Sequence, residues 1–212
     1  MNLYFFGDSI SFGQGISVDL TWVNKMAQQL HQKYGRDKTT VINTSINGNT
    51  TRMALERMPY DIQSHDVDVL LVGFGMNDCN YWVTDKGVPR VSPNAFRANL
   101  EEIIDRAFHF GVKKVVLRTN HPSPRTDYMI NTDITYGESN RFYNEIIREV
   151  AKNDSRIVFV DIEQVFDNYI KEHHVGLEEL TLPDGVHLSL LGHDVYFTCM
   201  YPVIAEIVEE EQ

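Results

Sequence analysis

The sequence predicts an α/β fold, a three-layer α/β/α sandwich in which helices cover both faces of a five-stranded parallel sheet. Short apolar runs typical of buried strands alternate along the chain with longer segments whose apolar residues recur at helical spacing. The clearest strand is at residues 67–72, which are apolar except for Asp68, as suits a strand buried on both faces. The clearest helix covers residues 93–110, with Ser92 as N-cap, Pro93 in the first turn and Gly111 after its end.

The other elements alternate in the same way from one end of the chain to the other. We expect strands at residues 3–6, 41–42, 67–72, 115–117 and 157–160, and helices at residues 22–30, 93–110, 139–151 and 190–209. Pro202 lies inside the last of these helices, where the missing N–H of proline should kink or interrupt it. Residues 1–212 are expected to form a single domain, because no repeat or linker-like segment divides them.

Composition excludes several classes of protein. Hydrophobic residues make up 42% and charged residues 23% of the 212 residues, which is ordinary for a globular chain. A formal net charge of −11 argues against a nucleic-acid partner, because phosphate binding needs clustered lysine and arginine. The opening apolar run is far shorter than the ~18 residues of a membrane span, so a cytoplasmic location is expected. Cys79 and Cys199 make neither a disulfide framework nor a metal site.

Polar turns follow the first three predicted strands. These turns carry Ser9, Gly48 and Asn77, in that order. Ligands of open parallel sheets bind beyond the carboxyl ends of the strands, so the three turns should meet at one edge of the sheet. Each turn taken alone is ordinary: a serine at a strand end is as often a helix cap, and Asn-Gly and Asn-Asp pairs are common turn residues.

One histidine stands out as a partner for Ser9. A serine hydroxyl is a poor nucleophile at neutral pH and needs a base within hydrogen-bond reach. Asp184 precedes His187 by three residues, a spacing that lets the carboxylate orient one ring nitrogen and leave the other for the nucleophile. Asp-x-x-His also occurs by chance, and the alternative is a structural histidine near the start of the last helix. Asn77 and the Gly48 N–H would donate hydrogen bonds to a developing oxyanion.

Together, the four segments resemble the SGNH hydrolases, also called the GDSL esterases and lipases. The segments are Phe6-Gly7-Asp8-Ser9-Ile10, the turn around Gly48, Gly75-Met76-Asn77-Asp78 and Asp184-Gly185-Val186-His187. Ile10 stands where the family name has leucine, and Asn47 where many relatives carry a small residue such as serine. The resemblance implies a flavodoxin-like fold and a Ser9–His187–Asp184 triad. It also implies an oxyanion hole formed by Ser9, Gly48 and Asn77, and chemistry without a metal or organic cofactor.

The substrate is expected to be a small or carbohydrate ester. The segment at residues 79–83 is aromatic and polar and leads into a loop at residues 84–91, and a second long loop, at residues 120–137, follows the fourth strand. Neither loop has the long apolar stretch of a lipase lid. The candidate substrate-binding residues are Asp8, Asp78, Tyr81, Trp82 and His121. Tyr81 and Trp82 could equally cover the sheet edge or form a dimer contact, so a homodimer stays open. Asp8 is expected to shape the turn around Ser9.

Four other functions are considered on the sequence alone. A thioesterase or lysophospholipase would use the same triad on longer acyl chains, and transfer of the acyl group to another alcohol would differ only in the acceptor. A flavodoxin-like nucleotide-binding module is disfavoured, because residues 7–15 lack the lysine of a triphosphate loop and Asp8 would repel phosphate. A catalytically inactive binding protein is disfavoured because every triad and oxyanion position is filled.

Overall fold

Five parallel strands form one sheet in the order β2-β1-β3-β4-β5 in the computed structural model, which describes residues 1–210. The strands are β1 Asn2–Gly7, β2 Thr40–Asn43, β3 Val69–Gly73, β4 Lys114–Arg118 and β5 Ile157–Val160. Every pair of neighbouring strands is parallel. All five residues of β3, in the middle of the sheet, are buried, as its unbroken apolar sequence predicts.

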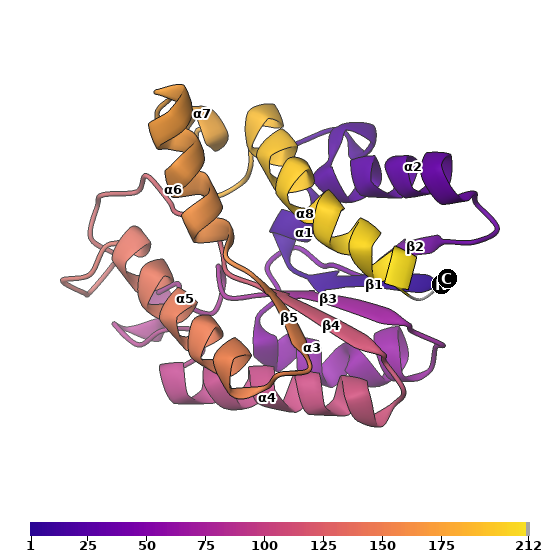
Figure 1. Ribbon diagram of the computed structural model, residues 1–212. Helices are drawn as coiled ribbons and strands as arrows, with labels where there is room; N and C mark the ends of the chain where they lie inside the picture. The colour runs from indigo at the N-terminus through magenta and orange to yellow at the C-terminus, as the bar shows by residue number, and fades with distance from the viewer. Residues whose placement is uncertain (211–212) are drawn as a thin grey trace.

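Helices cover both faces of this sheet (Figure 1). They are α1 Ser9–Phe12, α2 Trp22–Tyr34, α3 Thr51–Met58, α4 Pro93–His109, α5 Tyr136–Asn153, α6 Ile162–His173, α7 Leu177–Leu180 and α8 Leu190–Glu210. On one face α8 packs against α2, α6 and α7, and on the other α4 packs against α3 and α5. The predicted three-layer α/β/α fold is therefore confirmed.

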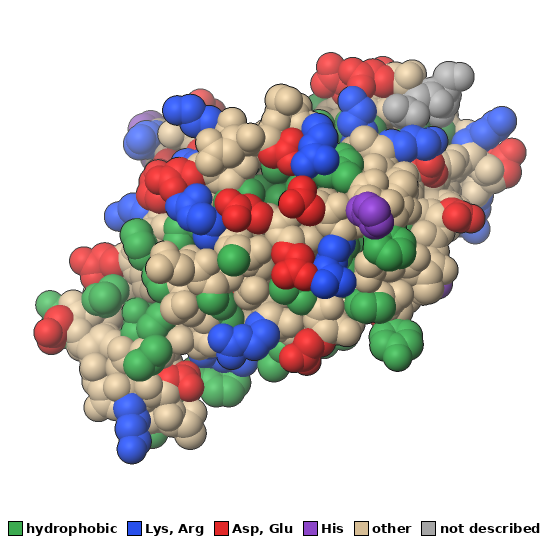
Figure 2. Space-filling model, turned by 90° about the horizontal axis from the view of Figure 1, so that it is seen from below, with side chains coloured by type: hydrophobic (Ala, Val, Ile, Leu, Met, Phe, Trp, Pro, Cys, Tyr) green, Lys and Arg blue, Asp and Glu red, His purple; other side chains and the backbone are tan. Residues whose placement is uncertain are grey.

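The outer surface on the side of α4 carries charges of both signs. Seen from below, acidic and basic side chains lie next to one another over this face (Figure 2). Ion pairs join Glu102 to Arg106 within α4 and Arg97 of α4 to Glu149 of α5. This layer thus presents a solvated, mixed-charge exterior. Among the described residues, no helix is both long enough and apolar enough to cross a membrane.

Every predicted strand and helix is present, with small shifts at the ends. The last helix is one correction: α8 continues through Pro202, since buried neighbours such as Met200 and Ile204 hold both sides of the proline against the core. Helix α5 starts at Tyr136, three residues earlier than expected, because Thr135 and Glu138 form a capping box. Helices α1, α3, α6 and α7 are not among the predicted elements.

The strand order places the first and third turns side by side. The chain passes from β1 to the edge strand β2 and then returns to β3 on the other side of β1, so the order reverses between these strands. Gly7 and Gly73 are paired at the carboxyl ends of β1 and β3. A Cβ atom on Gly7 would lie 2.8 Å from the Gly73 carbonyl oxygen, so this close approach requires glycine. The segments that follow both strands therefore start from one point.

Candidate active site

A short capped helix fixes Ser9 at the end of β1. Asp8 is the N-cap of α1, and its Oδ1 accepts a hydrogen bond from the Ile10 N–H at 3.0 Å. The helix ends after one turn at Gly13, whose φ of 86° is left-handed. A Cβ atom on Gly13 would lie 2.2 Å from the Thr21 side chain, so this position also requires glycine. Ser9, at the first position of α1, is thereby held in one orientation.

Ser9, His187 and Asp184 form a continuous hydrogen-bonded chain. The His187 Nδ1 lies 2.6 Å from Asp184 Oδ2, and its Nε2 lies 3.0 Å from Ser9 Oγ. A carboxylate only accepts, so Nδ1 carries the proton, Nε2 is the acceptor, and the Ser9 hydroxyl donates to it. This is the order of contacts that a serine–histidine–aspartate triad requires. The structure thus brings together three residues that are up to 178 positions apart.

The loop around Asp184 keeps its carboxylate charged. Asp184 Oδ1 accepts hydrogen bonds from the N–H groups of Val186 at 2.8 Å and His187 at 2.9 Å. Partial burial opposes ionisation, but these bonds and the one from the His187 ring outweigh it and lower the pKa of Asp184. A charged carboxylate in this place would stabilise a positive charge on the His187 ring.

The second and third turns bring Gly48 and Asn77 to the same edge of the sheet. Gly48 has a left-handed φ of 75°. The Asn77 side-chain amide donates to the Asn49 carbonyl at 3.1 Å and lies 3.5 Å from Asp8 Oδ2. The Asn77 amide thus joins the turn after β2 to the turn that carries Ser9.

Two buried carboxylates lie beneath these turns. Burial raises the pKa of Asp8, although the nearby Arg118 guanidinium opposes the rise. Burial also raises the pKa of Asp78 to about 6, against the lowering effect of its hydrogen bonds from Thr51. Those bonds run from the Thr51 N–H at 2.9 Å and hydroxyl at 2.6 Å to Oδ1, while Oδ2 has no partner. Asp78 therefore anchors the start of α3 to the turn that carries Asn77.

The five candidate substrate-binding residues fall into two groups. Asp8, Asp78 and His121 are each 0% exposed, so they present no surface to a substrate and act within the fold. Tyr81 is half-buried and Trp82 is 49% exposed. Only Tyr81 and Trp82 are therefore placed where a substrate could touch them. Strand-end position suggests proximity to a site, but it does not distinguish buried side chains from accessible ones.

Arginines that the sequence did not single out hold the turns in place. Arg57 of α3 donates to Asn49 Oδ1 at 2.7 Å and the Thr44 carbonyl at 2.6 Å. Arg90 donates to the Gly48 carbonyl at 3.3 Å, and its guanidinium lies over the Trp82 ring at 3.7 Å from the centroid.

A further arginine, in the loop after β4, supports the loop of the triad. Arg125 donates through Nε to the Asp184 carbonyl at 2.7 Å. Such contacts join segments that are distant in the sequence, so no local sequence pattern predicts them.

Two hollows lie between the segments at residues 80–84 and 125–136. Both segments belong to loops on the carboxyl side of the sheet (Figure 1). One, of about 460 Å³, is lined by aromatic and polar side chains: Asn80, Tyr81, Arg125, Asp127, Tyr128, Met129, Ile130 and Tyr136. The other, of about 390 Å³, is mainly apolar and is lined by Tyr81, Trp82, Val83, Thr84 and Ile130. Because Arg125 also contacts the Asp184 backbone, the first hollow adjoins the loop of the triad.

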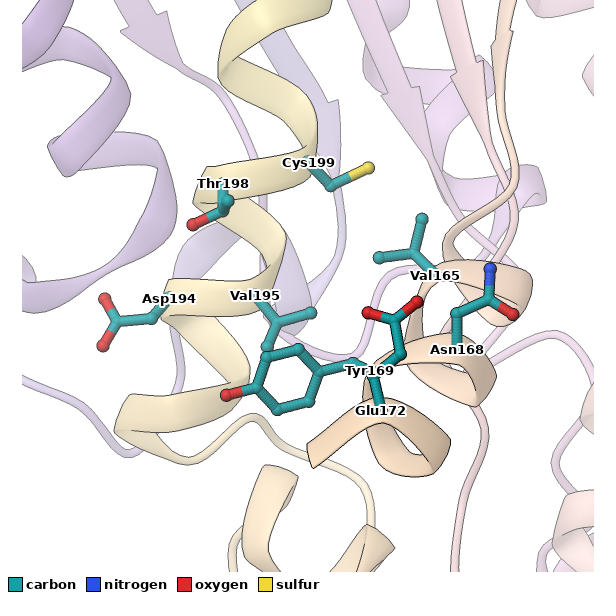
Figure 3. A pocket seen from close by; sticks show the side chains of 8 residues that line it. All are labelled: Val165, Asn168, Tyr169, Glu172, Asp194, Val195, Thr198 and Cys199. Carbon is teal, nitrogen blue, oxygen red and sulfur yellow. The ribbon is translucent and has the colours of Figure 1, made fainter. Parts of the chain in front are cut away.

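A separate cavity of about 430 Å³ lies between α6 and α8. Its lining side chains, Cys199 and Val195 of α8 and Val165 and Tyr169 of α6 among them, face one another across the gap (Figure 3). It includes no residue of the triad. Within residues 1–210, we find no group of three or more histidine, cysteine, aspartate or glutamate side chains placed to hold a metal ion.

A hydroxyl, an imidazole and a carboxylate in this order, at the carboxyl edge of a parallel sheet, define an α/β protein of the serine hydrolase type. Residues 5–195 match the model of the GDSL-like lipase/acylhydrolase family, so the chain belongs to this family and is a carboxylic ester hydrolase. The match confirms the resemblance carried by the four sequence segments.

Individual relatives agree with the family. An arylesterase of Vibrio mimicus is 27% identical over 207 residues, covering 97% of this chain and 84% of the relative. Thioesterase 1/protease 1/lysophospholipase L1 of Escherichia coli is 36% identical over 76 residues, which is 36% of this chain and 34% of that protein. The solved structure of an acetyl xylan esterase superposes with a TM-score of 0.79 at 22% identity, covering 96% of this chain and all of the other. That likeness shows a shared fold.

Proposed function

We propose that this chain is a serine esterase that hydrolyses small carboxylic esters through an acyl-enzyme. The observation that carries the proposal is the chain of contacts from Ser9 Oγ to His187 Nε2 at 3.0 Å and from His187 Nδ1 to Asp184 at 2.6 Å. Ser9 is the nucleophile, His187 the general base, and Asp184 the group that fixes the imidazole tautomer. Every catalytic group is supplied by this one chain.

In the first step, Ser9 Oγ attacks the ester carbonyl while His187 Nε2 takes the hydroxyl proton. The Ser9 and Gly48 N–H groups and the Asn77 amide stabilise the oxyanion. His187 then returns the proton to the departing alcohol as the ester bond breaks. In the second step, water adds to the acyl-enzyme by the same route, releasing the acid and restoring Ser9. The Asn77 amide exchanges its weak 3.5 Å contact with Asp8 for the oxyanion.

We infer that the acyl group is short and that the alcohol part is a carbohydrate. The hollow of about 460 Å³ next to Arg125 combines aromatic faces with amide, guanidinium and carboxylate groups, which suits a ring bearing several hydroxyls. It lies between the segment after Asn77 and the loop that contacts Asp184. An ester whose carbonyl is at Ser9 would direct its alcohol toward this hollow.

A second candidate is an esterase for longer acyl chains, including thioesters or lysophospholipids. The observation in its favour is the adjoining hollow of about 390 Å³, mainly apolar, with Trp82 49% and Val83 69% exposed at its surface. An acyl chain in this hollow would bury these side chains, which supplies a driving force for binding. The two candidates share the mechanism and differ in which part of the substrate the loops bind.

Hydrolysis of p-nitrophenyl acetate, butyrate and octanoate, together with acetate release from acetylated xylo-oligosaccharides, separates the two candidates. We expect kcat/KM to be highest for acetate and the acetylated sugar to be hydrolysed. Highest turnover on octanoate would support the longer-chain alternative. No turnover on any of these esters would contradict the proposed esterase activity.

A pair of tyrosine variants tests the hollow itself. Tyr128, which lines it, is 69% exposed, and Tyr60, outside both hollows, is 79% exposed. Tyr128→Ala should lower kcat/KM on the acetylated oligosaccharide about 10-fold, as loss of a ring contact does, and leave p-nitrophenyl acetate unaffected. Tyr60→Ala should change neither. Equal loss on both esters in Tyr128→Ala would argue against a sugar in the hollow.

A further inference from the structure

A buried chain of hydrogen bonds runs from the helix of Ser9 to the loop of His187. Arg118 Nη2 donates to Ser11 Oγ and Arg118 Nη1 to the Tyr196 hydroxyl, each at 3.2 Å. The Tyr196 oxygen lies 3.2 Å from His121 Nδ1, and His121 Nε2 lies 2.8 Å from the Val186 carbonyl oxygen. Ser11 is in the single turn of α1 that starts at Ser9, and Val186 directly precedes His187.

The direction of each of these hydrogen bonds is fixed by chemistry. The Val186 carbonyl only accepts, so His121 Nε2 carries the proton and Nδ1 accepts from the Tyr196 hydroxyl. The Tyr196 oxygen then receives its own hydrogen bond from Arg118, which only donates. Burial lowers the pKa of His121 to about 3, which keeps the imidazole neutral at neutral pH. A single placement of the protons therefore satisfies every hydrogen bond between these side chains.

The surroundings are buried, and Arg118 Nη1 has one further acceptor there, the Thr119 carbonyl at 3.3 Å. Tyr196 and His121 are each 0% exposed and Arg118 is 3% exposed, so water does not replace a lost contact. Gly73 makes room for the guanidinium, because a Cβ atom there would lie 2.4 Å from Arg118 Nη2. The Tyr196 ring packs against the rings of His121, Trp22 and Phe166, which fixes the place of its hydroxyl.

We propose that Arg118, Tyr196 and His121 are positioning residues that hold the turn of Ser9 and the loop of His187 at a fixed separation. This inference rests on the proposed function, in which Ser9 and His187 react together. Ser9 and His187 lie near opposite ends of the polypeptide, Ser9 in the one-turn helix α1 and His187 in a loop, whereas Arg118 ends β4 and Tyr196 lies in α8. The chain of hydrogen bonds therefore connects the turn of Ser9 and the loop of His187 to a strand and a helix of the core. A reaction across the 3.0 Å contact between Ser9 Oγ and His187 Nε2 needs both groups to be held in place in this way.

Matched tyrosine variants separate positioning from general stability. Tyr196→Phe removes the central hydroxyl of the chain. Tyr143→Phe is the control, because Tyr143 is equally buried and donates to the Val91 carbonyl, on a part of α5 with no contact to the triad. Each variant loses one buried hydroxyl, which takes part in two hydrogen bonds at Tyr196 and in one at Tyr143, so both should lose thermal stability. Only Tyr196→Phe should affect the reaction.

The readouts are the rate of Ser9 labelling by a fluorophosphonate, which needs no knowledge of the substrate, and kcat and KM for p-nitrophenyl acetate. We expect Tyr196→Phe to lower the labelling rate and kcat about 10- to 100-fold, with KM unchanged, and Tyr143→Phe to stay within about two-fold of wild type. Wild-type rates in Tyr196→Phe, or an equal loss in Tyr143→Phe, would overturn the proposal.

A histidine pair provides a second test that does not depend on Tyr196. His121→Gln keeps one acceptor and one donor at about the spacing of the ring nitrogens, whereas His121→Leu removes both. Glutamine should retain most of the wild-type labelling rate and leucine should lose it. Equal rates in the two variants would overturn the proposal. A wild-type protein that is not labelled at all would instead overturn the proposed function, and the positioning role with it.

Discussion

The Asp184 carboxylate makes hydrogen bonds both to the ring of His187 and to the backbone N–H of His187. Asp184 Oδ2 lies 2.6 Å from His187 Nδ1, and Asp184 Oδ1 accepts the His187 N–H at 2.9 Å. The three-residue spacing closes a tight loop in which one carboxylate fixes both the position and the tautomer of the imidazole. Nε2 is left to face Ser9.

Removing the charge of Asp184 should disable catalysis and preserve the loop. In Asp184→Asn, the amide oxygen still accepts the backbone N–H groups, but the amide nitrogen faces Nδ1 and stabilises the tautomer with its proton on Nε2. We expect kcat to fall on the order of 10³–10⁴-fold, with little change in melting temperature. Steady-state kinetics and thermal unfolding measure this. A variant within about ten-fold of wild type would show that Asp184 does not set the tautomer.

As the pH falls below neutral, activity should decline because one group gains a proton. Only the neutral imidazole of His187 accepts the Ser9 proton, so protonation of this ring should stop the reaction. The pKa of Asp184 is lowered, so this carboxylate stays charged while the ring gains its proton and adds no second titration. The measurement is kcat/KM on p-nitrophenyl acetate as a function of pH. We expect a single-proton decline toward pH 5, and a flat profile would contradict a histidine base.

Loss of the Asn77 amide should affect turnover more than binding. Asn77→Ala removes a donor that serves the oxyanion in the transition state, so kcat should fall about 10²- to 10³-fold with a small change in KM. Asn153→Ala, at the exposed end of α5, is the control and should match wild type. If KM rises and kcat does not change, Asn77 binds the ground state of the substrate.

Replacing Asp78 should stabilise the fold at neutral and alkaline pH. Burial raises the pKa of Asp78 from its ordinary 3.8 to about 6. The native state therefore holds a proton that the unfolded chain releases between about pH 4 and 6, and wild-type stability falls as pH rises through that window. Asp78→Asn keeps the acceptor for Thr51 and has no charge to bury.

The variant should therefore be more stable than wild type by up to about 3 kcal/mol at pH 8, and this difference should vanish toward pH 4. Urea unfolding of both proteins at the two pH values measures it. The same stability difference at pH 4 and pH 8 would show that Asp78 does not titrate in this window.

The strands and the order of the site segments were predictable because their signals are local. The run at residues 157–160 matches β5 to the residue, and the continuous apolar sequence of β3 marks the centre of the sheet. Helix α6 also has a local signal, because Ile162, Val165 and Phe166 follow the cap Asp161 at helical spacing. Helix α3 has no clear local signal, because Thr50 and Thr51 resemble the end of the preceding turn and Pro59 resembles the start of another loop.

The supports of the site were not predictable, because they are tertiary contacts of long side chains. Arg118 makes hydrogen bonds to Ser11, which is 107 residues away in the sequence, and to Tyr196, which is 78 residues away. Arg125 makes a hydrogen bond to Asp184, which is 59 residues away. The sequence offers one hint, a charged residue at the end of the buried strand β4, since a buried charge requires hydrogen-bond partners. For the same reason, the burial of His121 could not be read from its place after that strand.

The most direct test of the account is ester hydrolysis by Ser9→Ala beside Ser139→Ala. Both serines are buried, but the Ser139 hydroxyl donates to the Cys79 carbonyl from α5 and has no place in the triad. On p-nitrophenyl acetate, Ser9→Ala should lose at least about 10³-fold in kcat while keeping wild-type circular dichroism, and Ser139→Ala should stay near wild type. Near-normal turnover in Ser9→Ala would contradict the account, because the reaction would then proceed without the hydroxyl on which the triad is built.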